Sequence, residues 1–127
     1  MKFKMLLSAG LFVFCVGSSM NGIWGAFNIT PEILEALQRF DLTYTSLNFV
    51  LVPAITSTVL MLLPNTFRIG CVMNATILAS IAIIFLTKGD FAKFSIELLF
   101  VSLPIIMIFV GHPIKYISTI RAKNSID

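Results

Sequence analysis

Four apolar stretches, separated by short polar segments, run along this chain. An α-helix needs about 20 mostly apolar residues to cross the roughly 30 Å hydrocarbon core of a bilayer, and each stretch has about that length. Proline, glycine or polar residues at 64–65, 88–90 and 112–113 mark where the last three stretches end. The pattern therefore predicts four transmembrane helices, over residues 5–27, 44–63, 68–87 and 95–117.

The segment between the first two stretches has a different, amphipathic pattern. Thr30 is suited to cap a helix, and Pro31 suits the first helical position. The residues that follow divide into an apolar face (Ile33, Leu34, Leu37, Phe40) and a charged face (Glu32, Glu35, Arg39). Such a helix lies on a membrane surface. We predict it over residues 31–41, as a structural cap or as a lid over a substrate site.

The first stretch has a second interpretation, because Lys2 and Lys4 precede it and small residues at 16–19 resemble a cleavage site. These features are typical of a signal peptide. The apolar run continues to Phe27, however, which favours an uncleaved first helix.

Composition supports lipid as the solvent of this chain. Hydrophobic residues make up 57% and charged residues only 12%, whereas about a quarter of the residues of a soluble domain are charged. The prediction is all-α: one transmembrane domain over residues 1–127, a membrane four-helix bundle with a short amphipathic surface helix between helices 1 and 2. The net charge of +3 comes from basic residues near the chain ends, without the basic stripe of a nucleic-acid-binding protein.

The distribution of lysine and arginine predicts the orientation. Six of them lie in the N-terminus, the turn at 64–68 and the C-terminal tail, and three lie in the other two loops. Basic residues gather on the cytoplasmic side of membrane proteins. We therefore expect an integral protein of the bacterial cytoplasmic (inner) membrane with both termini in the cytoplasm.

Few side chains in this sequence are suited to catalysis or metal binding. Glu97 is predicted near the outer surface, close to Lys93, where interfacial pairing is the simplest interpretation. His112 is predicted at the inner interface, and the chain has no second histidine to share a haem or metal. No catalytic or metal-binding constellation is evident, so we expect a non-enzymatic protein without an evident cofactor, although a quinone or lipid is compatible with it.

The two cysteines, Cys15 and Cys71, lie at different distances from their predicted helix starts. At about 1.5 Å per residue their depths would differ by about 10 Å, whereas a disulfide needs Cα atoms within about 7 Å. We expect two free, buried thiols.

Neutral polar residues within the apolar stretches are the candidate site. They are Ser18, Asn21, Thr56, Ser57, Thr58, Asn74 and Thr76. Hydroxyls and amides at membrane depth often bond between packed helices, and packing is one interpretation of all of them. The other is a polar intramembrane pocket between helices 1, 2 and 3. For Asn74 we predict a position inside the bundle with a hydrogen bond to a neighbouring helix.

The arrangement resembles the DoxX-like family of small four-helix membrane proteins. The likeness rests on Gly10–Phe14 followed by Gly17, on the turn Leu62–Gly70, and on Thr87–Asp90 before the last helix. The resemblance implies the fold, and implies roles such as accessory or assembly subunit of a membrane complex.

Three functions follow from these observations. The first is a non-catalytic accessory or assembly subunit, with other membrane subunits or further copies of the chain as partners and no nucleic acid. The second is a quinone- or lipid-binding subunit of a membrane oxidoreductase. The third is an immunity protein against a membrane-active toxin.

Overall fold

The computed structural model describes residues 2–28, 31–39, 41 and 44–124. The helices within them are α1 (Lys2–Phe27), α2 (Pro31–Arg39), α3 (Tyr44–Leu62), α4 (Phe67–Thr87), α5 (Phe91–Val110) and α6 (Pro113–Asn124). No strand occurs in these residues. The predicted all-α bundle is confirmed.

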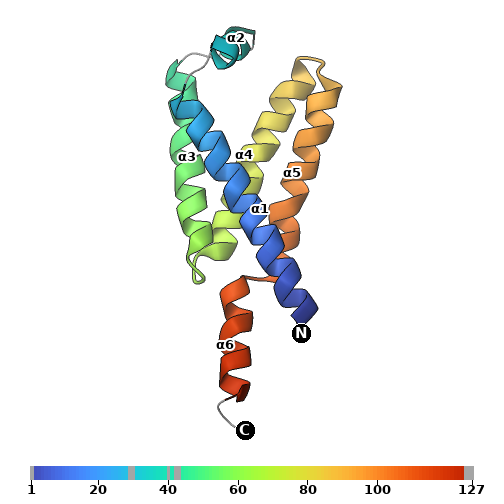
Figure 1. Cartoon of the computed structure of the whole chain (residues 1–127). Coiled ribbons are helices and arrows are strands. Elements are labelled where there is room, and N and C mark those ends of the chain that lie inside the picture. The colour runs from blue at the N-terminus through green and yellow to red at the C-terminus, as the bar shows by residue number, and fades with distance from the viewer. Residues whose placement is uncertain (1, 29–30, 40, 42–43, 125–127) are drawn as a thin grey trace.

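Four of the helices, α1, α3, α4 and α5, form the bundle (Figure 1). α1 crosses the other three obliquely, beside α3 at the α2 end of the molecule and nearer to α5 and α6 at the other end. Its 26 residues rise about 39 Å, more than the hydrocarbon core, and a helix of that length fits by tilting. Both ends of the chain lie at the α6 end, opposite α2.

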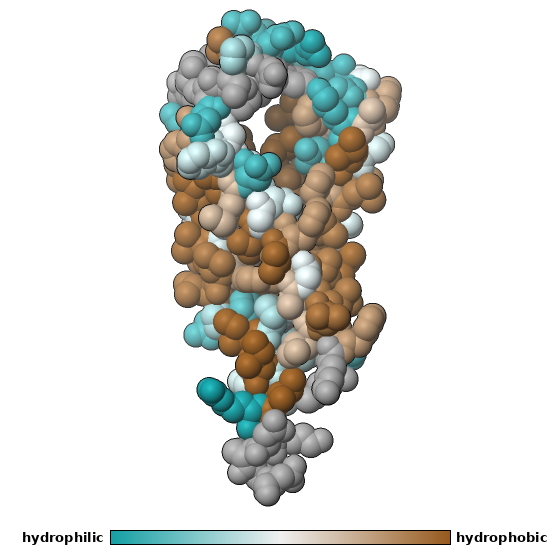
Figure 2. All heavy atoms as spheres, in the orientation of Figure 1, coloured by the Kyte–Doolittle hydropathy of each residue, from teal (hydrophilic) through white to brown (hydrophobic). Residues whose placement is uncertain are grey.

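The surface of the bundle is apolar, as lipid contact requires. Phe109 is 85% exposed and Phe49 is 77% exposed, and apolar side chains cover the middle of the molecule below a hydrophilic end (Figure 2). Within the described residues, three segments are long and apolar enough to cross a membrane: Phe3–Phe27, Phe67–Thr87 and Phe91–Ala122. The chain is an integral membrane protein. The apolar helical segment Asn48–Leu62 of α3, within the described residues, is shorter.

The predicted bounds of the first three spans agree with the helices within a few residues, whereas the predicted fourth span, 95–117, includes a break between two helices. α5 begins at Phe91, where the Asp90 carboxylate accepts a hydrogen bond from the Lys93 backbone N–H at 3.1 Å, and it ends at Val110. Gly111 then adopts a φ of +88°, and Pro113 has no N–H to continue the helix. Residues to 117, predicted in the same span, belong to α6.

Side chains from two other helices satisfy the carbonyl groups at this break. The Ser8 hydroxyl of α1 donates to the Gly111 carbonyl at 2.6 Å, and the Tyr116 hydroxyl of α6 donates to the Val110 carbonyl. Because each carbonyl has a donor, the chain can change direction here at little cost in lost hydrogen bonds.

Helices α3 and α4 approach each other closely at Gly70. A Cβ atom added to Gly70 would lie 2.6 Å from the Met61 backbone nitrogen and 2.8 Å from the Ser57 carbonyl oxygen. Only a glycine lets two backbones come this close without displacement. The contact fixes the position of α4 against α3.

A buried cluster fills the half of the bundle nearer α6. Its members are Cys15, Val16, Met61, Phe67, Cys71 and Met107. Both cysteines are free thiols, as predicted, but the predicted difference in depth is wrong, since they share the cluster and interact electrostatically. The start of α1 extends past the bundle (Figure 1), so the number of residues from a helix start does not measure depth.

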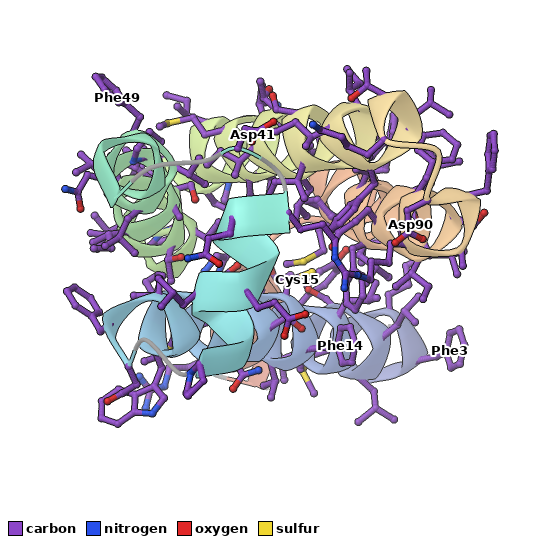
Figure 3. All side chains as sticks on the ribbon, turned by 90° about the horizontal axis from the view of Figure 1, so that it is seen from above. Phe3, Phe14, Cys15, Asp41, Phe49 and Asp90 are labelled. Carbon is purple, nitrogen blue, oxygen red and sulfur yellow. The ribbon has the colours of Figure 1, made fainter. Side chains whose placement is uncertain are left out.

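The amphipathic helix is present as α2 and ends at Arg39, two residues before the predicted limit. Seen from above, it lies across the end of the bundle, over the space between α1 and α4 (Figure 3). An Arg39–Glu35 pair at 3.5 Å lies along it, and Asp41 pairs with Lys88 of the α4–α5 turn at 3.7 Å. The predicted cap Thr30 and the apolar-face residue Phe40 lie outside the described residues, as do the side chains of Ile33 and Leu37.

Candidate intramembrane ligand site

A cavity of about 440 Å³ lies between α1, α3, α4 and α5, in the half of the bundle nearer α2. It forms because α1 is tilted toward α3 at this end and lies away from α5 (Figure 1). In the space-filling view the molecule is hollowed below α2 (Figure 2). Cys15, Leu103 and Pro104 line its deep end, where the side chain of Cys15 points into the bundle (Figure 3).

The lining is mostly apolar, with a few polar groups from three helices. Ser18, Asn21 and Asn74 were predicted, and all three line the cavity. Ser19 and Glu97 line it as well. The Ser18 hydroxyl already donates to the Phe14 carbonyl at 2.8 Å, which leaves its oxygen as an acceptor for a further partner.

The other predicted pocket residues, Thr56, Ser57, Thr58 and Thr76, do not line the cavity. Each hydroxyl donates to a carbonyl of its own helix. Ser57 and Thr58 are buried, whereas Thr56 and Thr76 are exposed on the outside of the bundle. Successive helical residues point about 100° apart, so three consecutive hydroxyls cannot face one cavity.

Asn74 lies inside the bundle, with 7% of its surface exposed, as predicted. The predicted hydrogen bond to a neighbouring helix is wrong, because no described residue bonds to its amide. The amide is not sealed in the protein interior either. It is therefore open to the cavity, at the deep end of the site.

Glu97 departs from its predicted role at the interface. Lys93 pairs with Asp90 at 3.5 Å and also lies 5.5 Å from the centre of the Phe85 ring. Glu97, one turn further along α5, lines the cavity instead and forms no ion pair with the described residues. Its carboxylate is the one acidic group of the described chain in this cavity.

His112, which was predicted at the inner interface, is only 1% exposed and does not line the cavity. Its ring contacts Phe12 and Phe67 edge-on, with centroid distances of 4.9 Å for each pair. Nδ1 accepts a hydrogen bond from the Ile114 backbone N–H at 3.2 Å. Two carbonyl groups at the end of α3 face the ring, yet Nε2 lacks a partner of hydrogen-bond geometry among the described residues. The histidine packs α6 against the bundle.

The pocket was predicted between the first three spans, so the wall that α5 contributes was missed. Glu97, Phe100 and Pro104 are spaced by three and then four residues, so they share one face of that helix. This spacing is a readable signal. Whether this face of α5 points toward a cavity or toward lipid depends on the tilt of α1.

Comparison with known proteins does not identify the family of this chain. No family model matches it, and neither the curated proteins nor the solved structures contain a significant match. What the site does must therefore be inferred from its geometry.

Proposed function

We propose that this chain is a DoxX-like protein of the bacterial cytoplasmic membrane that binds a small membrane-soluble molecule, of the lipid or quinone class, as a subunit of a membrane complex. The observation that carries the proposal is the cavity with the open amide of Asn74 at its deep end.

Size and chemistry both support a ligand. Cavities of about 300–1,000 Å³ with an apolar lining and a few polar groups are typical of small-molecule sites, and this one has about 440 Å³. A buried polar group without a partner costs about 1–3 kcal/mol. A ligand hydroxyl or carbonyl bonded to the Asn74 amide would remove that cost.

The proposed orientation rests on the basic residues. With both termini in the cytoplasm, Arg68, Lys115 and Arg121 lie on the cytoplasmic side, which is where such residues gather. The cavity then opens in the outer half of the bilayer. A molecule from the outer leaflet would reach it without crossing the membrane.

An accessory role through helix packing is a second candidate, and α1 favours it. Gly10 and Gly17 are exposed, and nothing lies within 4 Å of a Cβ added at either of them. Small residues let another transmembrane helix approach closely. Co-purification in a mild detergent tests this role, and a strictly solitary protein would contradict it.

Extraction of the purified protein tests ligand binding directly. We expect mass spectrometry to find one lipid or isoprenoid enriched over the bulk lipid of the preparation. Asn74→Leu should lose that enrichment without lowering stability, because the Asn74 amide makes no hydrogen bond with the described residues.

The matched control is Thr76→Val, because Thr76 is on the same helix but exposed outside the cavity. It should retain the ligand. An extract with no enriched molecule, or equal enrichment in Asn74→Leu and the original protein, would overturn the proposal.

A further inference from the structure

We infer that the molecule held in this cavity carries one positive charge, as an amphiphilic amine or quaternary ammonium, and that Glu97 is its counter-ion. The inference rests on the proposed function and narrows it, since it selects a cationic amphiphile over a neutral lipid or quinone.

The position of Glu97 is the first reason. The residue is in the second turn of α5, seven residues beyond the Asp90 cap, and its side chain is half-buried against the cavity. Acidic groups at membrane depth are costly and usually mark a site for an ion or substrate. An ionised carboxylate facing an apolar lining gains most from a cation that enters with its own apolar groups.

The protein offers Glu97 no cation of its own among the described residues. Lys93, the nearest base in sequence on α5, pairs with Asp90 toward the membrane surface. The other bases near this end of the bundle are paired elsewhere, Lys88 with Asp41 and Arg39 with Glu35. The described bases Lys4, Arg68, Lys115 and Arg121 belong to segments at the opposite end. Among the described residues no base is therefore left to pair with Glu97, and a cationic ligand would supply the counter-charge.

The surroundings of Glu97 favour an organic cation over a metal ion. Within the described part of the chain, no group of three or more His, Cys, Asp or Glu side chains is placed to hold a metal. Phe100 lies nearly one turn below Glu97 and also lines the cavity, and its ring is stacked on Phe14 with centroids 6.1 Å apart and planes 5° apart. A fixed aromatic ring beside a carboxylate suits an alkylated ammonium group.

The depth of Glu97 fits the orientation of such a molecule. Glu97 and Ile81 are each seven residues from the ends of the α4–α5 turn, so they lie at about the same level. Asn74 is seven residues deeper along α4, which corresponds to about 10 Å. The charged group would thus lie toward the membrane surface and the rest of the molecule toward Asn74 and Leu103. The contacts to Glu97 and to Asn74 are separate enough to be tested independently.

The inference is tested by measuring the binding of two probes that carry the same alkyl chain but differ in charge. Radiolabelled dodecyltrimethylammonium and dodecanol differ in charge but not in chain length, and the first keeps its charge at every pH. With the protein in lipid nanodiscs, we expect the cationic probe to bind at least tenfold more tightly than the neutral one, after correction for partition into empty nanodiscs. Glu97→Gln, which preserves size, should reduce binding of the cation at least tenfold and leave dodecanol unchanged.

Glu35→Gln is the matched control, because it changes the net charge equally at an exposed position on α2. It should bind both probes as the original protein does. If Glu97→Gln fails to fold, competition between the two probes on the unmodified protein still decides, since equal displacement contradicts a cation site.

The outcomes separate this inference from the proposed function. Equal binding of both probes, unaffected by Glu97→Gln, would refute the cationic ligand while leaving a neutral ligand in place. Binding of neither probe, together with no enriched molecule in the extracts, would overturn both.

Discussion

Replacement of Gly70 by alanine tests the contact that holds α3 and α4 together. The added Cβ would lie 2.6 Å from the Met61 backbone nitrogen, 2.8 Å from its Cγ and 2.8 Å from the Ser57 carbonyl oxygen. Two of these three neighbours are backbone atoms, which cannot rotate away as a side chain can. The two helices must therefore separate or shift.

The size of the effect follows from how far these distances fall short of ordinary van der Waals contact. Ordinary van der Waals contact begins at 3.4 Å, so the backbones must move apart by about 0.8 Å, and a gap of that size forfeits about a quarter to a half of each dispersion contact. Overpacking of this kind costs about 1–3 kcal/mol. Alanine also has a better helix propensity than glycine, by about 1 kcal/mol, which would partly hide the loss.

Gly17→Ala is the control, because it gains the same helix propensity without the close contact. Gly17 is also helical, but nothing lies within 4 Å of its added Cβ. We expect the free energy of unfolding of Gly70→Ala to fall about 1–3 kcal/mol below that of Gly17→Ala, as measured by denaturant titration in mixed micelles. Equal stabilities of the two variants would refute the close contact between α3 and α4.

Three further predictions concern the bundle ends, the cysteines and the topology. Ser8→Ala should lower stability by about 1 kcal/mol, because the Gly111 carbonyl loses its donor, whereas Ser102→Ala, whose hydroxyl bonds within α5, should have a smaller effect in the same unfolding assay. Cys71, which is fully buried and does not line the cavity, should resist maleimide until the protein is denatured. A reductant-sensitive mobility shift, lost when either Cys15 or Cys71 is replaced by serine, would disprove free thiols. Reporter fusions after Asp127 and within residues 31–39 should report opposite sides of the membrane, with the first cytoplasmic; same-side signals would refute four crossings.

The helices of this protein could be predicted more accurately than its site. Hydropathy placed α4 within one residue, because lipid imposes both the length and the apolar composition of a crossing. Hydropathy also extended the predicted fourth span beyond Val110, because Gly111 and His112 interrupt the helix without making the segment polar.

The cavity could not be predicted from the sequence pattern of any one helix. Asn74 and Asn21 were found because an amide is unusual at membrane depth, whereas Glu97 was assigned to the interface from its nearness to Lys93 in sequence. Whether Glu97 faces a cavity depends on where the distant helix α1 leans. That lean depends on contacts such as Ser8 with Gly111, which no local pattern contains.

The hydrogen bond from Ser8 to Gly111 also constrains the order in which this protein can assemble. The two residues are 103 positions apart, so α1 leaves the ribosome long before the acceptor for its serine has been synthesised. Until then α1 can be held only by α3, while the α4–α5 hairpin has still to enter the membrane. The wall that α5 contributes to the cavity is therefore completed last, when the break after α5 reaches α1. Folding during translation would leave the cavity open to surrounding lipid until that final step.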